Sequence, residues 1–144
     1  MGLDQALAIS VSAIEAERQN MEIISSNIAN VNTTRSLDGG PYRRLYVAFT
    51  ETPLSFEQEL GLAQTRLDKK LGGVKALILQ DNSPLKKVYN PSHPDADKNG
   101  FVDMPNVDMS KEMVNMVESS KMYEANIAAY NSTKKMIQDT LSIQ

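Results

Sequence analysis

The chain of 144 residues contains no cysteine, no tryptophan and a single histidine, His93. Without cysteine it can form no disulfide, no thiolate nucleophile and no cysteine metal site. It also lacks a phosphate-binding P-loop, a dinucleotide-binding glycine fingerprint and a nucleophile elbow. We therefore predict that the protein is not an enzyme, that it holds no cofactor and that it takes no small-molecule substrate.

Long apolar runs are missing as well. No stretch reaches the roughly 18 apolar residues of a membrane span, so we expect no membrane insertion. The first twenty residues include Asp4, Glu15 and Glu17 and lack a basic region followed by an apolar one. That composition argues against a cleaved secretory signal.

No segment of the chain carries an excess of positive charge. Residues 1–31 carry one arginine against four carboxylates, and residues 32–108 and 109–144 are each neutral. A nucleic-acid binder needs a cationic surface to displace counterions, so we exclude that class of protein. The basic pairs at 43–44 and 86–87 are interpreted as solvated strand faces.

Both ends of the chain carry apolar residues at a spacing of seven, the pattern of a helix that packs against other helices. In the N-terminal segment, Leu3 to Ala29, the repeat consists of Leu7, Ile14, Met21 and Ile28, with Leu3, Ile24 and Val31 beside it. In the C-terminal segment, Asp108 to Ile143, it consists of Met109, Met116, Tyr123, Tyr130 and Ile137, with Met113, Ile127 and Leu141 beside it. Polar residues interrupt both repeats, at Ser10, Glu17, Ser120 and Lys134. Because a closed two-helix hairpin would leave them against apolar surface, we expect more than one partner helix.

Between the helices the pattern changes to short alternating or apolar runs separated by turn residues, which is typical of strands. The first helix should end in an asparagine-rich run, where asparagine tolerates the left-handed conformation and its amide satisfies carbonyls. Asp108 should cap the last helix, with Glu112 in its first turn. We expect strands at 42–49, 74–79, 85–89 and 101–102, and a loop or short helix at 51–71.

These elements predict an α+β fold. The long N- and C-terminal helices should pack as a coiled-coil-like pair, with a small antiparallel β module between them in sequence. The expected division is an N-terminal helix over 1–34, a β-rich module over 35–107 that includes the loop 51–71, and a C-terminal helix over 108–144.

The loop 95–103 copies half of a calcium-binding EF-hand, with oxygen ligands at positions 1, 3, 5 and 9 and glycine at position 6. Asn106 stands where a bidentate glutamate should close the shell, and the prolines at 91 and 94 exclude the entering helix. We interpret the loop as a turn whose side chains cap their own backbone. The alternative function is a calcium-responsive helical binding module with four ligands: Asp95, Asp97, Asn99 and Asp103.

The segment from Ser25 to Thr33 resembles the asparagine-rich motif that ends the N-terminal helix of bacterial flagellar rod and hook axial proteins, with direct matches at Ala29, Asn30 and Thr33. Other segments resemble the proximal rod proteins of that family, namely 39–43, 72–74, 89–91, 93–94, Asp97, 99–102, 104–108 and 123–126. The loop 51–71 departs from the family by its greater length.

The resemblance implies a structural subunit of the proximal rod of the flagellar basal body, in the periplasmic space. Such subunits leave through the flagellar type III export apparatus without a cleaved signal. They assemble helically with copies of themselves and other rod proteins into the drive shaft that transmits torque from motor to hook. Apolar stripes left incomplete until neighbours arrive suit such head-to-tail contacts. A monomeric two-helix adaptor is a third possibility.

The residues expected at the subunit interface share the two apolar seams or the asparagine-rich motifs beside them. They are Leu7, Ile14, Met21, Ile24, Ile28, Asn30, Thr33, Met113, Met116, Tyr123, Asn126, Ile127, Tyr130 and Ile137.

Overall fold

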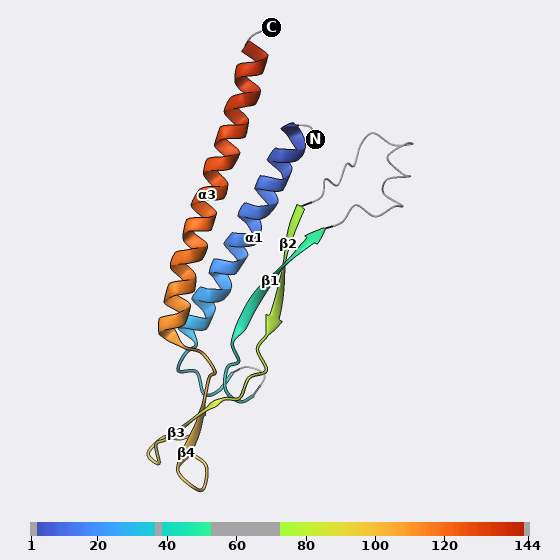
Figure 1. The fold of residues 1–144 in the computed structure, drawn as a ribbon. Coiled ribbons are helices and arrows are strands. Elements are labelled where there is room, and N and C mark those ends of the chain that lie inside the picture. Colours follow the sequence, from blue (N-terminus) through green and yellow to red (C-terminus); the bar gives the residue numbers. More distant parts are fainter. Residues whose placement is uncertain (1–2, 37–38, 53–72, 143–144) are drawn as a thin grey trace, which may run out of the picture. The chain divides into compact units, whose positions relative to one another are not determined.

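The computed structural model describes residues 3–36, 39–52 and 73–142 (Figure 1). Within these described residues, two long helices flank four strands in chain order, which confirms the α+β class and the small antiparallel β region. Most of the loop expected at 51–71 lies outside the described residues. The elements are α1 (Leu3–Ala29), β1 (Leu45–Thr52), β2 (Gly73–Gln80), β3 (Lys86–Tyr89), β4 (Phe101–Met104) and α3 (Met109–Ser142).

The end of α1 is stabilised by the side chains of its asparagine-rich motif. Asn30 Nδ2 donates to Ser26 O at 2.9 Å, and Thr33 Oγ1 donates to Asn30 Oδ1 at 3.1 Å. The expected left-handed asparagine is wrong, since positive φ occurs among the described residues only at glycines. The carbonyls of Ile28 and Asn30 accept from the backbone N–H groups of Val31 at 3.4 Å and Thr33 at 3.0 Å, so tight turns end the helix without a left-handed residue.

The start of α3 follows the expected capping pattern. Asp108 Oδ1 accepts hydrogen bonds from the backbone N–H groups of Ser110 at 3.0 Å and Lys111 at 3.3 Å. These bonds satisfy donors that the first turn of a helix leaves without partners. Asp108 is therefore the N-cap, and Glu112 lies in the first turn.

The strands form two two-stranded sheets, β1 with β2 and β3 with β4. In the second sheet the strands are antiparallel and Tyr89 lies opposite Phe101, with ring centroids 5.4 Å apart in an edge-to-face arrangement. β1 begins three residues later than expected, at Leu45, and β4 is longer than expected.

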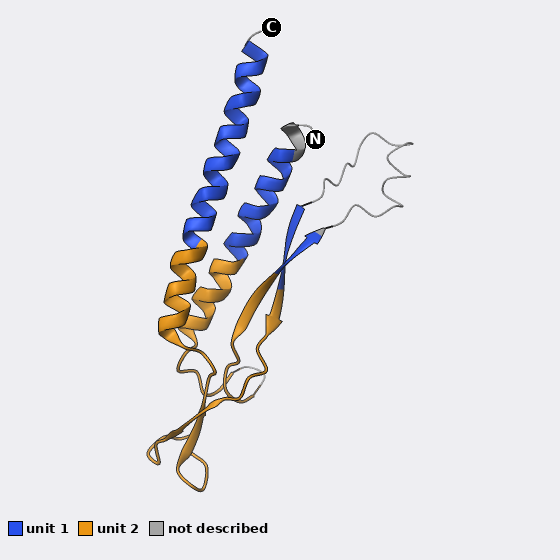
Figure 2. Cartoon of the chain, viewed as in Figure 1, with its two compact units in different colours: residues 1–19, 49–77, 120–144 blue, residues 20–48, 78–119 orange. Residues whose placement is uncertain are grey.

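The chain divides into two compact units (Figure 2). Unit 1 comprises residues 1–19, 49–77 and 120–144, and unit 2 comprises residues 20–48 and 78–119. In unit 1, Ser12 Oγ accepts a hydrogen bond from the backbone N–H of Val74 at 3.0 Å. A Cβ at Gly73 would lie 2.6 Å from that oxygen, so only glycine allows β2 to approach α1 this closely.

The apolar core of the described residues is small. Its buried hydrophobic members are Ala16 in unit 1 and Ile24, Val102 and Val107 in unit 2. No helix within 3–36 or 73–142 is long and apolar enough to cross a membrane. The polar groups that lie with this small core therefore matter for holding the elements together.

Candidate functional site

A buried asparagine lies at the centre of unit 2. Asn27, in the last turn of α1, is 0% exposed. Its Nδ2 donates to Leu45 O at 2.7 Å and to Glu112 Oε2 at 2.9 Å. Its Oδ1 accepts from Leu45 N at 3.0 Å and from the Tyr42 hydroxyl at 2.9 Å. Both donors and both lone pairs of the amide are used, so Asn27 ties the end of α1 to the start of β1 and of α3.

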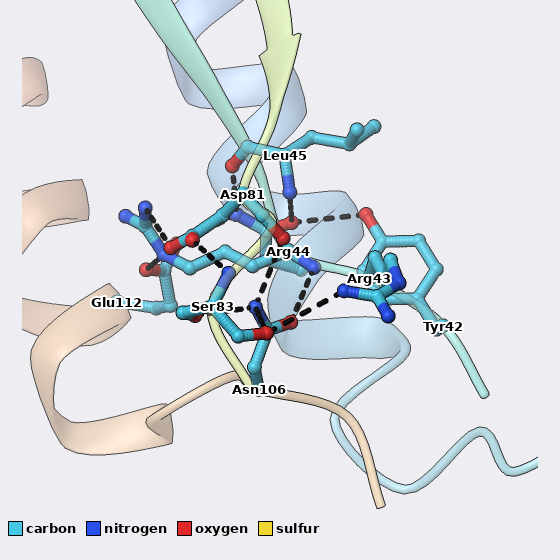
Figure 3. Close-up of polar contacts among 9 residues, drawn as sticks. Tyr42, Arg43, Arg44, Leu45, Asp81, Ser83, Asn106 and Glu112 are labelled. Atoms are coloured by element: carbon cyan, nitrogen blue, oxygen red, sulfur yellow. Dashed lines mark hydrogen bonds and ion pairs between the residues drawn. The ribbon is translucent and has the colours of Figure 1, made fainter. Parts of the chain in front are cut away.

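Glu112 is the second fully buried polar residue of this group. Its other oxygen, Oε1, accepts from Arg44 Nε at 2.8 Å, and the Arg44 side chain is 20% exposed. The interpretation of Arg44 as a solvated strand face is therefore wrong. A buried carboxylate is costly without partners, and here each oxygen has one donor (Figure 3).

Asn106 joins the loop before α3 to the same group. Its Oδ1 accepts from Arg44 N at 2.8 Å, and its Nδ2 donates to Ser83 Oγ at 2.8 Å and to Asp81 O at 3.1 Å (Figure 3). The Asp81 carboxylate accepts from Ser83 N, and this bond, with the Ser83 hydroxyl and the nearby Arg44 charge, lowers the pKa of Asp81. We call Asn27, Tyr42, Arg44, Asn106 and Glu112 the junction cluster.

A second polar contact joins the helices of unit 2. Asn20 Nδ2 on α1 donates to Ser119 Oγ on α3 at 3.2 Å. Asn20 precedes Asn27 by seven residues, and Ser119 follows Glu112 by seven. Residue numbers therefore rise along α1 as they fall along α3, so the helices are antiparallel there, with two polar pairs one heptad apart.

Sequence reasoning named Asn27, Arg44 and Glu112 separately and missed their contact. A signal was present: Asn27 is three residues after Ile24, and Glu112 is four residues before Met116. Each polar side chain thus shares the helix face of an apolar seam. The identity of the partners was not readable, because Asn27 and Glu112 are 85 positions apart.

The loop 95–103 uses its carboxylates within the chain. Asp97 Oδ1 accepts from Phe101 N at 2.9 Å and from Asn99 N at 2.8 Å, and these bonds, led by Phe101, lower the pKa of Asp97. Asp95 accepts from Thr34 Oγ1 at 2.8 Å and forms an ion pair with Arg35. The geometry is that of an aspartate-capped turn.

Neighbouring residues support the same interpretation. Gly100 has φ +80°, and a Cβ there would lie 2.9 Å from the Tyr89 ring. His93 Nδ1 accepts a hydrogen bond from Asp95 N at 3.1 Å, a loop-stabilising role. The described residues contain no group of three or more side chains suited to hold a metal. Three of the calcium candidates do border an open pocket of about 310 Å³, lined by Thr34, Arg35, Gly40, Pro41, Asp95, Asp97, Phe101 and Asp103.

The expected interface residues differ in how far their own chain covers them. Ile24 is buried, and Asn30 and Thr33 hydrogen-bond to each other. Met113 is 51% exposed. The others are half-buried: Leu7, Ile14, Met21, Ile28, Met116, Tyr123, Asn126, Ile127, Tyr130 and Ile137. Most of the two seams is therefore only partly covered.

Large hydrophobic side chains lie exposed on both units. In α3, which has 34 residues, only Glu112 and Ser119 are buried, so the described helix beyond Ser119 buries no residue. The exposed ones of unit 2 are Tyr46, Ile78, Leu79, Val88, Tyr89, Phe101, Met109, Met113, Val114 and Val117. Those of unit 1 are Ile9, Val11, Phe49, Leu77, Met122, Met136 and Leu141.

Comparison with known proteins gives a family for this arrangement. Residues 7–35 match a family described as flagella basal body rod protein, and residues 98–143 match the C-terminal family of the flagellar basal body rod FlgEFG proteins. The two matched segments contain nearly all of α1 and all of α3.

Full-length relatives agree. The flagellar basal-body rod protein FlgC of Borreliella burgdorferi is 41% identical over 149 residues, covering 99% of this chain and 98% of the relative. FlgC of Bacillus subtilis is 41% identical over 143 residues, covering 96% and 95%, and FlgC of Salmonella typhimurium is 36% identical over 144 residues, covering 99% and 98%. The chain belongs to the flagellar basal-body rod proteins and, within them, to the FlgC family. It is a structural subunit of the basal-body rod, not an enzyme.

Proposed function

We propose that the subunit assembles with copies of itself and with other rod proteins into a helical tube. That tube forms the proximal rod and carries torque from the motor to the hook across the periplasm. We further propose that the chain reaches the rod through the flagellar type III export apparatus. Its lack of cysteine and its small core suit a chain that must pass through a narrow channel unfolded and fold afterwards.

The uncovered surface of α3 carries this proposal. Val114 is 66% exposed and Val117 is 56% exposed, although both are hydrophobic and stand on a well-formed helix. Soluble monomers rarely expose large contiguous apolar patches, and such patches usually mark interaction sites. A neighbouring subunit in the rod would bury them.

The half-buried seams suit the same role. Residues such as Met21 and Ile28 on α1 and Tyr123 and Ile137 on α3 keep part of their surface free for a second helix. A heterologous contact, in which one face meets a different face of the next copy, continues into a helical assembly. We propose the interface set named from the sequence, apart from Ile24, which its own chain already buries, and extended by Val114 and Val117.

The test is to place a charge at these exposed positions. Val114→Asp and Val117→Asp should change the stability of the isolated subunit by about 0.5 kcal/mol or less, because each position is exposed. In the rod the same carboxylate would be buried without a partner, at a cost of several kcal/mol for every subunit. We expect cells with either variant to make and export the protein yet to lack rods and motility.

The control is Lys98→Asp, a charge change at an exposed position of the loop before β4. It should leave rods and motility close to those of unaltered cells. Normal rods built from both valine variants would show that this face of α3 meets no neighbour.

A further inference from the structure

The two polar pairs between α1 and α3 bear on the axial register of the two helices, which the apolar seams do not determine. Each seam repeats every seven residues, so sliding one helix along the other by one heptad brings equivalent apolar residues level again. Such a slide is about 10 Å at 1.5 Å per residue. The seams alone therefore do not define how far α1 extends along α3.

We propose that the junction cluster sets the axial register of α1 against α3, with Asn27 and Glu112 as the positioning residues. In the native register Asn27 satisfies one oxygen of Glu112, while Arg44 satisfies the other at 2.8 Å. A slide by one heptad that brings Asn27 level with Ser119 separates Asn27 from Glu112 and leaves a fully buried carboxylate short of one donor.

The Asn20 to Ser119 pair cannot make this choice alone. If α1 slides so that Asn27 lies level with Ser119, Asn20 lies level with Asn126, and both new pairs are polar on each side. In that slide Glu112 loses one of its two partners, Asn27, and gains no polar residue of α1 in its place. The carboxylate, rather than the asparagines, is therefore what distinguishes the two registers.

Contacts to the strands fix the other half of the cluster. Asn27 is bound to both backbone groups of Leu45, and Arg44 N is bound to Asn106 Oδ1. These bonds hold Arg44 beside Glu112 and hold the end of α1 beside β1. Contacts with β1 therefore help to fix the register of α1, in addition to its contacts with α3. A buried polar residue at a seam position is a known means of fixing register at some cost in stability.

The natural absence of cysteine allows a direct test by cross-linking of the purified full chain. Asn20→Cys with Ser119→Cys reports the native register, because these two side chains meet there. Asn20→Cys with Asn126→Cys reports the register shifted by one heptad. Both reporter pairs replace Asn20, so they perturb the second polar contact equally. A short bifunctional thiol reagent joins only the pair that lies level.

Each reporter pair is placed in the unaltered chain and in a chain with Asn27→Leu, Glu112→Leu and Arg44→Met. The apolar replacements keep volume and remove the polar preference. The ratio of native to shifted product should be high in the unaltered chain and fall at least about tenfold in the triple variant. The control carries Glu118→Leu and Asn131→Leu, two exposed positions of α3, and should keep the high ratio.

An unchanged ratio in a triple variant that retains its helices by circular dichroism would overturn the proposal. If the triple variant loses its helices, Glu112→Gln decides instead. Glutamine keeps the shape but has one acceptor oxygen where glutamate has two, so its NH2 group faces a donor on Asn27 or Arg44 and one of the two hydrogen bonds is lost. The ratio should therefore fall roughly threefold. An unchanged ratio in that folded variant would overturn the proposal equally.

Discussion

At the scale of residues, a few fully satisfied polar groups join the elements of unit 2 around a small apolar core. Asn27 and Glu112 are both 0% exposed, and every side-chain oxygen and amide proton of Asn27 has a partner. In the described residues no buried side-chain nitrogen or oxygen lacks a hydrogen bond. Because half-satisfied buried networks are costly, changes within the junction cluster should affect stability far more than similar changes on the surface.

Arg44→Met tests that contrast. It leaves the buried Glu112 carboxylate with one donor fewer, and removing one partner of a buried ion pair typically costs about 3–5 kcal/mol. The matched control is Arg18→Met, which breaks an ion pair with Glu15 whose side chains are 48% and 52% exposed. Because that pair is exposed to solvent, its loss should lower the stability far less than the loss of Arg44. Urea denaturation of the purified variants measures both, and equal losses would contradict the role assigned to Arg44.

The aspartate-capped turn predicts how the stability of the fold depends on pH. The hydrogen bonds from Phe101 and Asn99 lower the pKa of Asp97 in the folded chain. Its ionised form therefore stabilises the fold above the ordinary carboxyl pKa of about 3.9, and this contribution is lost as the pH falls through the lowered value.

Asp97→Asn should flatten the dependence of the urea midpoint on pH below about pH 4, while keeping the turn, since a single oxygen accepts both bonds. Asp97→Ala should lower the midpoint at neutral pH as well, because it removes that acceptor. Isothermal titration with calcium should show no binding to the unaltered chain. A calcium affinity in the micromolar range that is lost on Asp97→Asn would instead restore the metal interpretation of the loop.

At the scale of elements, local patterns were enough to predict most of the fold. The seven-residue repeats gave both helices, because a helix face is defined by residues close in sequence. Asp108 predicted the start of α3, because an N-cap also binds backbone groups only a few residues away in sequence. The start of β1 was predicted three residues early, because Tyr42 and Arg44 continue the alternating pattern of the strand. In the structure, however, the Tyr42 hydroxyl binds Asn27 and the backbone N–H of Arg44 binds Asn106.

The candidate site was less predictable, because it is built from long-range contacts. Arg44 and Glu112 are 68 positions apart, and no pattern within a window of a few residues indicates that they pair. The division of the chain at 34 and 107 also stays a prediction. The compact units of the structure divide both helices instead, with α1 passing from unit 1 to unit 2 after Gln19.

The uneven burial along α3 predicts uneven stability in the isolated subunit. Residues 109–119 include Glu112 and Ser119, whereas the described helix from Ser120 to Ser142 has no buried residue. A helix without tertiary packing is marginal in water. Hydrogen exchange of the purified subunit should show at least about tenfold greater protection of amides in 109–119 than in 130–142. Uniform protection along α3 would mean that its second half is stable without neighbours.

At the scale of the whole molecule, the proposed assembly treats the chain as an incomplete structure that its neighbours finish. Seventeen large hydrophobic side chains are exposed among the described residues, against four buried hydrophobic ones. This balance would be a liability in a protein that works alone, and it is what a subunit of a tube requires. In the proposed assembly the junction cluster holds the elements within the subunit, while the apolar surfaces make the contacts between subunits.

The most direct test of this account is a side-chain resolution density map of the rod in isolated basal bodies. The map should show Val114, Val117 and Met136, all more than half exposed in the single chain, enclosed by side chains of neighbouring subunits. It should also show Asn27 bonded to Glu112 within each copy. A rod in which these three hydrophobic residues face solvent would contradict the claim that assembly completes the subunit.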